Sequence, residues 1–198
     1  YGLTETAPTV CVIPSFKETR KIGSIGFPLP GTDVKILDLK DPSNEVPQGV
    51  DGELAVYGPQ VMKGYWNNLD ANKESFIDFG ENRYFLTGDI GHIDENGYVV
   101  ITDRKKDMII VSGFNVYPRE VEDMLYTHPK VEIAAVIGVP NDKSGEHVKA
   151  FIKLKEGQTA TTEEVFSFCK ENITGYKRPK QIEFRDNIPL SNVGKVLR

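Results

Sequence analysis

The chain has 198 residues, of which 39% are hydrophobic and 27% are charged, with 18 Gly and 12 Pro. This composition is typical of a soluble globular protein of one or two domains, and it excludes a collagen-like or largely disordered chain. The net charge of −5 argues against a general nucleic-acid binder. No apolar run approaches the roughly 18 to 20 residues of a spanning helix, so we predict no transmembrane segment.

The two cysteines, Cys11 and Cys169, lie far apart, without C-x-x-C spacing and without further partners for a zinc site. This usage is typical of a reducing compartment, and we predict a cytoplasmic location. None of the three histidines has a second histidine or cysteine at metal spacing, so we assign them no catalytic role. His128 is expected to end a helix, and His147 to lie at a strand edge.

The first hundred residues alternate short β-like runs with closely spaced turn residues. Residues 34–37 and 52–57 are β-like, and Pro47-Gln48-Gly49 precedes the second run. Asp94-Glu95-Asn96-Gly97 predicts a hairpin turn, because Asn-Gly tolerates the positive φ that such turns need, and residues 98–102 follow as a strand. We therefore predict a mostly β module.

Beyond residue 105 the pattern predicts fewer and longer elements. An apolar run at residues 108–111 is followed by a helix that begins near Pro118, a residue suited to a first helical turn, and ends before Pro129. Two Val- and Ile-rich strands follow at residues 131–139 and 148–155. The short polar loop between them predicts antiparallel neighbours.

A second helix and a last strand complete this half. Thr161 and Glu164 fit a capping box, and Val165 and Cys169 belong to the apolar face of the helix that follows. Residues 181–185 read as a strand. The order helix, strand, strand, helix, strand predicts a small α+β domain.

Five consecutive charged residues, Asp103-Arg104-Lys105-Lys106-Asp107, separate these two patterns, and such a run is not expected inside a core. A solvated turn is the alternative reading. We predict an α+β fold with a mostly β part over residues 1–104 and an α+β domain over residues 105–198. The first part carries 9 basic and 16 acidic residues and the second 15 basic and 13 acidic.

Seven short motifs follow one another along the chain: Tyr1-Gly2-Leu3-Thr4-Glu5, Gly58-Pro59-Gln60-Val61-Met62-Lys63-Gly64-Tyr65-Trp66, Thr87-Gly88-Asp89, Asp103-Arg104-Lys105-Lys106-Asp107, Ser112-Gly113-Phe114-Asn115-Val116-Tyr117-Pro118, Tyr176-Lys177-Arg178-Pro179-Lys180 and Pro189-Leu190-Ser191-Asn192-Val193-Gly194-Lys195. Each is weak alone. In this order they resemble the adenylate-forming enzymes, and most closely the long-chain fatty acyl-CoA synthetases.

The resemblance implies an ATP-dependent fatty acid:CoA ligase, which forms acyl-adenylate and pyrophosphate and then acyl-CoA and AMP. Residues 1–104 would be the end of a large AMP-binding domain, and residues 105–198 a mobile C-terminal domain. The chain would be a fragment, inactive alone, because the phosphate-binding loop and the acyl pocket of such enzymes lie upstream. The implied small molecules are a fatty acid, ATP, coenzyme A and Mg²⁺, while peripheral membrane contact and oligomeric state stay open.

The resemblance also implies roles for residues around the nucleotide. Lys195 would bridge carboxylate and phosphate, since a flexible point charge can offset both anions. Glu5 would bind Mg²⁺ as a hard carboxylate ligand. Thr4 would donate to a phosphate, Tyr1 would flank the adenine, and Gly2 belongs to the same cofactor-binding motif.

Asp89 and Arg104 would form the ribose clamp, because a carboxylate can accept hydrogen bonds from two vicinal hydroxyls. Lys106 would be the hinge about which the C-terminal domain turns between the two half-reactions. Gly113 would then line the passage for the pantetheine thiol.

Coenzyme A carries several phosphates, so its docking surface is expected to be basic. Residues 170–198 hold seven basic and three acidic residues. By resemblance, Tyr176 would stack near the coenzyme A adenine, with Arg178 and Lys180 toward its phosphates.

Simpler readings exist for each motif taken alone: a helix cap at Thr4-Glu5, a turn at Ser112-Gly113 and a surface lysine at Lys195. Two other functions stay open as well. One is an adenylation domain that loads a carrier protein, and the other is a stand-alone module that binds a nucleotide or coenzyme A.

Overall fold

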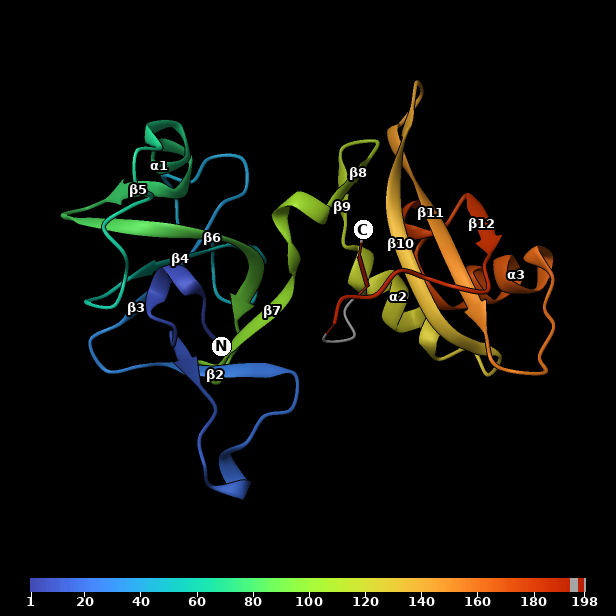
Figure 1. Cartoon of the computed structure of the whole chain (residues 1–198), viewed down its shortest axis with the longest axis horizontal. Coiled ribbons are helices and arrows are strands. Elements are labelled where there is room, and N and C mark those ends of the chain that lie inside the picture. Colours follow the sequence, from blue (N-terminus) through green and yellow to red (C-terminus); the bar gives the residue numbers. More distant parts are fainter. Residues whose placement is uncertain (193–195, 198) are drawn as a thin grey trace. The chain divides into compact units, whose positions relative to one another are not determined.

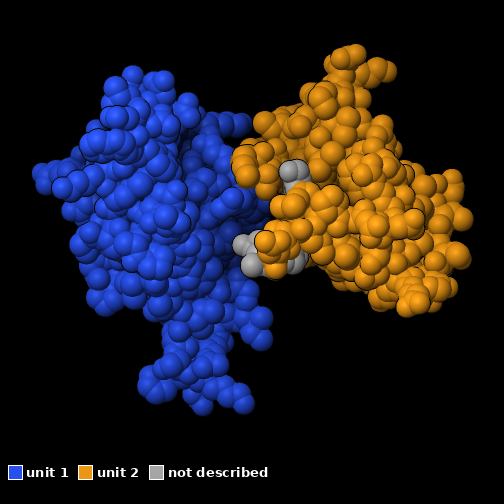
Figure 2. All heavy atoms as spheres, viewed as in Figure 1, with its two compact units in different colours: residues 1–105 blue, residues 106–198 orange. Residues whose placement is uncertain are grey.

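The computed structural model describes residues 1–192 and 196–197. It divides into two compact units, Tyr1–Lys105 and Lys106–Arg198, which Figure 2 colours separately. Each unit has its own hydrophobic core. No helix among the described residues is long and apolar enough to cross a membrane.

Unit 1 is built on a strongly β framework (Figure 1). Its seven-stranded sheet has the order β1-β2-β7-β6-β4-β3, with β5 paired to β6. The strands are β1 Cys11–Val12, β2 Ser24–Pro28, β3 Asp33–Leu37, β4 Gly52–Tyr57, β5 Phe76–Phe79, β6 Asn82–Ile93 and β7 Val99–Arg104. The helices are η1 Thr4–Thr6, η2 Lys17–Thr19 and α1 Leu69–Ser75, and η3 Lys105–Asp107 joins this unit to the next.

The hairpin between β6 and β7 is the predicted one. Gly97 has φ +83°, and the Asp94 carboxylate accepts the N–H groups of Asn96 and Tyr98, so the turn residues satisfy one another. The mostly β character of this half is confirmed. Sequence reasoning missed α1, although Asn68 caps it by accepting the Ala71 N–H at 3.1 Å.

Unit 2 combines a five-stranded sheet with two α-helices (Figure 1). The sheet has the order β10-β11-β8-β9, and β12 pairs in parallel with β11. Its strands are β8 Ile109–Val111, β9 Phe114–Val116, β10 Val131–Asn141, β11 Gly145–Leu154 and β12 Gln181–Phe184. Its helices are α2 Pro118–Tyr126, α3 Thr162–Asn172 and η4 Gly175–Lys177.

The predicted antiparallel pair is confirmed as β10 and β11, and both strands are longer than expected. Strand β9 was missed, because we expected a helix directly after the apolar run. Ser112 and Gly113 both adopt positive φ, 51° and 84°, and so form a tight turn that folds β9 back on β8. His147 lies inside β11, paired with Val139, and the prediction of a strand-edge position is wrong.

The two helices begin as predicted. Pro118 is the first residue of α2, and Thr161 accepts the Glu164 N–H at 3.2 Å at the start of α3. The Glu164 carboxylate forms an ion pair with Lys130 at 2.8 Å, so this side chain connects α3 to the turn that precedes β10. The helices bury Val121, Leu125, Val165 and Cys169 against the sheet.

The alternation of β8 provides a direct test of this core. Ile109 is 1% exposed and Ile110 is 47% exposed, although the two are identical neighbours. We expect Ile109→Ala to lower the free energy of unfolding of unit 2 by about 2 to 5 kcal/mol, because it leaves a cavity. Ile110→Ala should cost less than about 1 kcal/mol. Urea unfolding followed by circular dichroism measures both, and equal losses would contradict the orientation of this strand.

Candidate active site

Three predicted residues of unit 1 meet at one carboxylate. Asp89 in β6 lies directly opposite Arg104 in β7. Arg104 Nε donates to Asp89 Oδ1 at 3.0 Å, and the Tyr1 hydroxyl donates to Oδ2. Asp89 is only 5% exposed, whereas the Arg104 side chain is 54% exposed. The carboxylate is thus held in place from both sides.

Backbone geometry fixes the orientation of Asp89. Its N–H donates to Thr87 Oγ1 at 3.1 Å, and Gly88 adopts φ +72°, a conformation that favours glycine. Burial, and next the hydrogen bond to Asp89, raise the pKa of the Tyr1 phenol, so this hydroxyl stays a donor. Each carboxylate oxygen has a second lone pair, which leaves Asp89 able to accept from two neighbouring hydroxyls of a ligand.

Glu5, the predicted metal ligand, has a partner that sequence reasoning missed. The Tyr65 hydroxyl donates to Glu5 Oε1 at 2.8 Å, and the Met62 N–H donates to the Glu5 carbonyl oxygen at 2.8 Å. Burial, and next the hydrogen bond to the Glu5 carboxylate, raise the pKa of Tyr65. The only signal in the sequence was the place of Tyr65 in the second motif of the series.

The described residues include no group of three His, Cys, Asp or Glu that could hold a metal ion. A single carboxylate fits Mg²⁺ only where phosphates and waters supply the other ligands, and Glu5 offers such a carboxylate. Thr4 precedes it and is exposed at the start of η1. Gly2 is required by space, since an added Cβ would lie 1.9 Å from the Pro8 carbonyl oxygen.

In unit 2 the turn at Gly113 lies beside an aromatic pair. The Phe114 ring stacks on Tyr176, with centroids 4.8 Å apart and an interplanar angle of 26°. Phe114 is nevertheless 56% exposed. Gly113 has φ +84° and nothing within 4 Å of an added Cβ, so its constraint is conformational. Sequence reasoning placed Tyr176 at this site but gave Phe114 no role.

A hollow of about 490 Å³ brings the predicted basic residues of unit 2 together. Arg178 donates from Nε to the Ile173 carbonyl at 2.9 Å and from Nη2 to the Lys170 carbonyl at 3.0 Å, and so secures the end of α3. Lys180 is exposed and has no side-chain partner in the described part of the chain. The residues that line the hollow are Val111, Ser112, Asn141, Ser144, His147, Val148, Gly175, Tyr176, Arg178, Lys180 and Gln181.

His147 adds an unexpected polar group to this hollow. Both of its ring nitrogens are buried and lack a hydrogen-bond partner among the described residues. A buried imidazole without a partner is costly, so a bound ligand or water would satisfy it.

Two further predicted residues complete the account. Lys106 is the first residue of unit 2 and lies in η3. Lys195 lies outside the described residues. Within the charged run, Asp103 is only 6% exposed, so the expectation that the run stays out of a core is wrong for this residue, whereas residues 104–107 are not buried.

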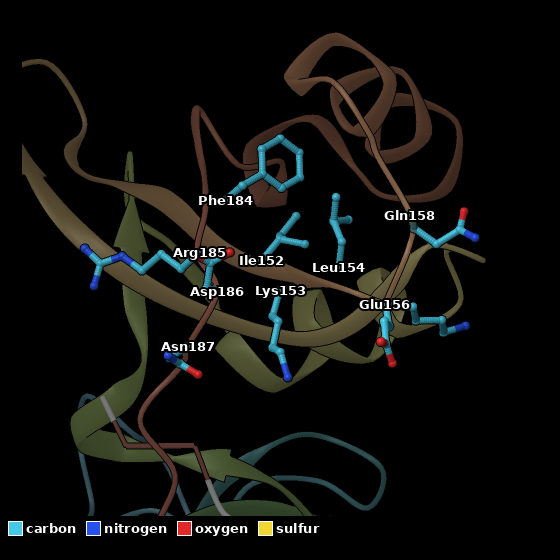
Figure 3. A pocket seen from close by; sticks show the side chains of 10 residues that line it. Ile152, Lys153, Leu154, Glu156, Gln158, Phe184, Arg185, Asp186 and Asn187 are labelled. Carbon is cyan, nitrogen blue, oxygen red and sulfur yellow. The ribbon is translucent and has the colours of Figure 1, made fainter.

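A larger hollow, of about 660 Å³, lies elsewhere in unit 2 and contains no predicted residue. Figure 3 shows Phe184, Ile152 and Leu154 grouped together, while Arg185 and Glu156 point away from one another. Two cations that line it already form ion pairs: Lys153 with Glu132 and Arg185 with Glu183. A binding site needs convergent polar groups, and we assign none here.

The contact between Glu5 and Tyr65 predicts a titration. Because the Glu5 carboxylate contributes to the raised pKa of Tyr65, Glu5→Gln should lower that pKa toward the ordinary value for tyrosine. NMR of ¹³Cζ-labelled tyrosine measures it, and Tyr65→Phe identifies the signal. The pKa of Tyr84, raised to about 12 by burial and its bond to Asp33, should not move. An unchanged Tyr65 titration would contradict the contact.

Comparisons with known proteins find relatives of both units. Residues 1–66 match the family model of the AMP-binding enzymes, and residues 120–195 match that of the AMP-binding enzyme C-terminal domain. A long-chain-fatty-acid–CoA ligase of Escherichia coli O6:H1 is 52% identical over all 198 residues, which cover 34% of that protein. A feruloyl-CoA synthase of Amycolatopsis is 44% identical over 199 aligned residues, covering the whole chain and 39% of the synthase.

Solved structures give the same result. ATP-bound MatB from Rhodopseudomonas palustris is 38% identical with a TM-score of 0.89, over 99% of this chain and 38% of its own. The o-succinylbenzoate CoA synthetase MenE from Bacillus subtilis, in complex with its acyl-adenylate, is 36% identical with a TM-score of 0.84, over 100% of this chain and 39% of its own. The chain spans about a third of the length of the curated long-chain ligases that it matches. It belongs to the adenylate-forming AMP-binding enzymes and carries the C-terminal domain of that family.

Proposed function

We propose that this chain serves an ATP-dependent long-chain fatty acid:CoA ligase and supplies its ribose clamp, hinge and C-terminal domain. The observation that carries the proposal is the convergence of Tyr1 and Arg104 on the buried Asp89 carboxylate. It occurs in a chain that is 44 to 52% identical along its whole length to long-chain-fatty-acid–CoA ligases. We also propose a cytoplasmic location, supported by two buried cysteines that form no disulfide.

The first half-reaction joins a carboxylate to the α-phosphorus of ATP and expels pyrophosphate. Asp89 would accept hydrogen bonds from the ribose hydroxyls, while Arg104 and Tyr1 keep its carboxylate oriented. Lys195 would offset the charge of the two reacting anions as the transition state forms. Mg²⁺, bound through Glu5, would neutralise phosphate charge, and the Tyr65 hydroxyl would keep the Glu5 carboxylate in position.

In the second half-reaction, the thiol of coenzyme A attacks the acyl carbon of the adenylate and AMP leaves. Gly113 would line the passage for the thiol, because it carries no side chain. Tyr176 and Phe114 offer an aromatic surface for the adenine of coenzyme A. Lys180, which has no side-chain partner among the described residues, offers a cation for its phosphates. Arg178 has two of its nitrogens bonded to backbone carbonyls and would contribute less. A rotation at Lys106 would exchange the two arrangements.

The substrate class is a narrower proposal than the reaction. The curated long-chain ligases include the E. coli and B. subtilis proteins, at 52% and 44% identity, and these support a fatty acid. The feruloyl-CoA synthase at 44% identity shows that similar chains occur beside other acyl pockets. A carrier-protein acceptor is the rival for the thiol, and the excess of seven basic over three acidic residues in 170–198 favours coenzyme A.

A domain exchange tests the proposed function. This chain replaces the matching 198-residue segment of the E. coli ligase, and the hybrid is assayed for release of pyrophosphate and formation of palmitoyl-CoA. We expect both activities, because the two proteins are 52% identical over all 198 residues of this chain. The same hybrid with Asp89→Ala should lose at least about a hundredfold in kcat/KM for ATP. A folded hybrid that forms neither product would contradict the proposal.

The two half-reactions should respond to different substitutions in the hybrid. Lys195→Ala should block pyrophosphate release while a supplied palmitoyl-adenylate still reacts with coenzyme A. Gly113→Leu should do the reverse, because a side chain in the passage obstructs only the thiol. Each step is measured separately, as pyrophosphate release and as thioester formation.

Gly157→Leu is the matched control for Gly113→Leu. Gly157 also lies in unit 2, has φ +73° and has nothing within 4 Å of an added Cβ, so the two substitutions introduce similar backbone strain. We expect Gly157→Leu to leave both half-reactions unchanged. If either Lys195→Ala or Gly113→Leu impaired both steps equally, its assigned role would be wrong.

A further inference from the structure

The buried carboxylate of Glu53 contacts one residue of β6 and the residue that follows β7. Glu53, in β4, is 4% exposed. Its Oε1 accepts the Gly88 N–H at 3.2 Å, and its Oε2 accepts from Lys105 Nζ at 2.6 Å. The Glu53 side chain therefore connects β6 to the residue that directly follows β7.

These two contacts lie next to the last residue pair at one end of the β6–β7 ladder. Asp89 is paired with Arg104 there. Glu53 contacts Gly88, which precedes Asp89, and Lys105, which follows Arg104. Unit 1 ends at Lys105 and unit 2 begins at Lys106. The Glu53–Lys105 ion pair thus lies between the Asp89 cluster and the point where the chain leaves unit 1.

The Glu53–Lys105 pair differs from an ordinary surface ion pair because its carboxylate is buried. The Lys105 side chain is 42% exposed, but that of Glu53 is 5% exposed. A buried carboxylate that loses its cation keeps its desolvation cost, and Glu53 would retain only the neutral Gly88 N–H as a described partner. Removal of the Lys105 ammonium should therefore loosen the local backbone.

We propose that Glu53 and Lys105 form a latch that keeps β7 paired through Arg104, so that rotation between the units begins at Lys106. Through Gly88 the same latch holds the turn that orients Asp89. Glu53 and Lys105 are positioning residues, because neither contacts the reacting groups. The functional consequence rests on the proposed ligase activity, whereas the mechanical one does not.

Hydrogen–deuterium exchange on the 198-residue chain tests the mechanical part without any enzymatic assay. In Lys105→Met, the amides of residues 87–89 and 103–107 should exchange about tenfold faster, the effect of losing one strong ion pair. Exchange in the rest of unit 1 should stay within twofold of the wild type. Lys105→Arg should restore slow exchange, because it restores the cation.

Lys35→Met is the matched control. It removes a cation from the Lys35–Glu45 pair, also in unit 1 and also short at 2.9 Å, and should leave residues 87–89 and 103–107 unchanged. Three results would overturn the latch: unchanged exchange in Lys105→Met, equal acceleration across all of unit 1, or no rescue by Lys105→Arg.

The hybrid ligase tests the functional part. Lys105→Met should raise KM for ATP about tenfold in pyrophosphate release, with kcat within about threefold. A wild-type hybrid that lacks activity would refute the proposed function and leave the exchange result standing. An active hybrid in which Lys105→Met keeps the wild-type KM would refute the link from the latch to Asp89.

Discussion

Burial of the Asp89 carboxylate is the constraint on which the organisation of unit 1 depends. A buried carboxylate that is 5% exposed needs hydrogen-bond donors, and the fold supplies them from Tyr1 and from Arg104 on the opposite strand. The Asp89 N–H in turn donates to Thr87 Oγ1. The pairing of β6 with β7 brings Arg104 opposite Asp89. The same donors hold the carboxylate in one orientation, which the proposed recognition of vicinal hydroxyls requires. Stability and the proposed binding therefore depend on the same contacts.

Unit 2 offers a different kind of candidate binding surface, on the outside of its fold. Its proposed ligand is a long anionic molecule, and the surface offers a turn that contains Gly113, a stacked aromatic pair, and a lysine without a side-chain partner among the described residues. The frame behind them is conventional: two helices bury their apolar faces on a five-stranded sheet. Arg178 illustrates how frame and site compete for the same residue. We expected it at the ligand, and it lines the same hollow as Tyr176 and Lys180, but two of its nitrogens are also bonded to the backbone at the end of α3.

Local patterns in the sequence were sufficient for the elements with strong local signals. Asn96-Gly97 predicted its hairpin, Pro118 and Thr161 predicted two helix starts, and the Val- and Ile-rich runs predicted β10 and β11. Strand β9 was not predicted, because it has only three residues and its turn places a serine at positive φ. No simple sequence rule favours serine in that conformation. Among the candidate site residues, motif order predicted Tyr1, Asp89 and Arg104, whose side chains meet in the structure. The contact of Tyr65 with Glu5 spans 60 residues, and no local pattern can predict such a pairing.

The stacked rings of Phe114 and Tyr176 join two segments that the sequence keeps far apart. Phe114 begins the strand next to the Gly113 turn, and Tyr176 belongs to the short helix η4. Because the rings are in contact, a displacement of the hairpin carries the aromatic platform with it. In the proposed ligase, the passage for the thiol and the aromatic surface for the adenine would therefore move together.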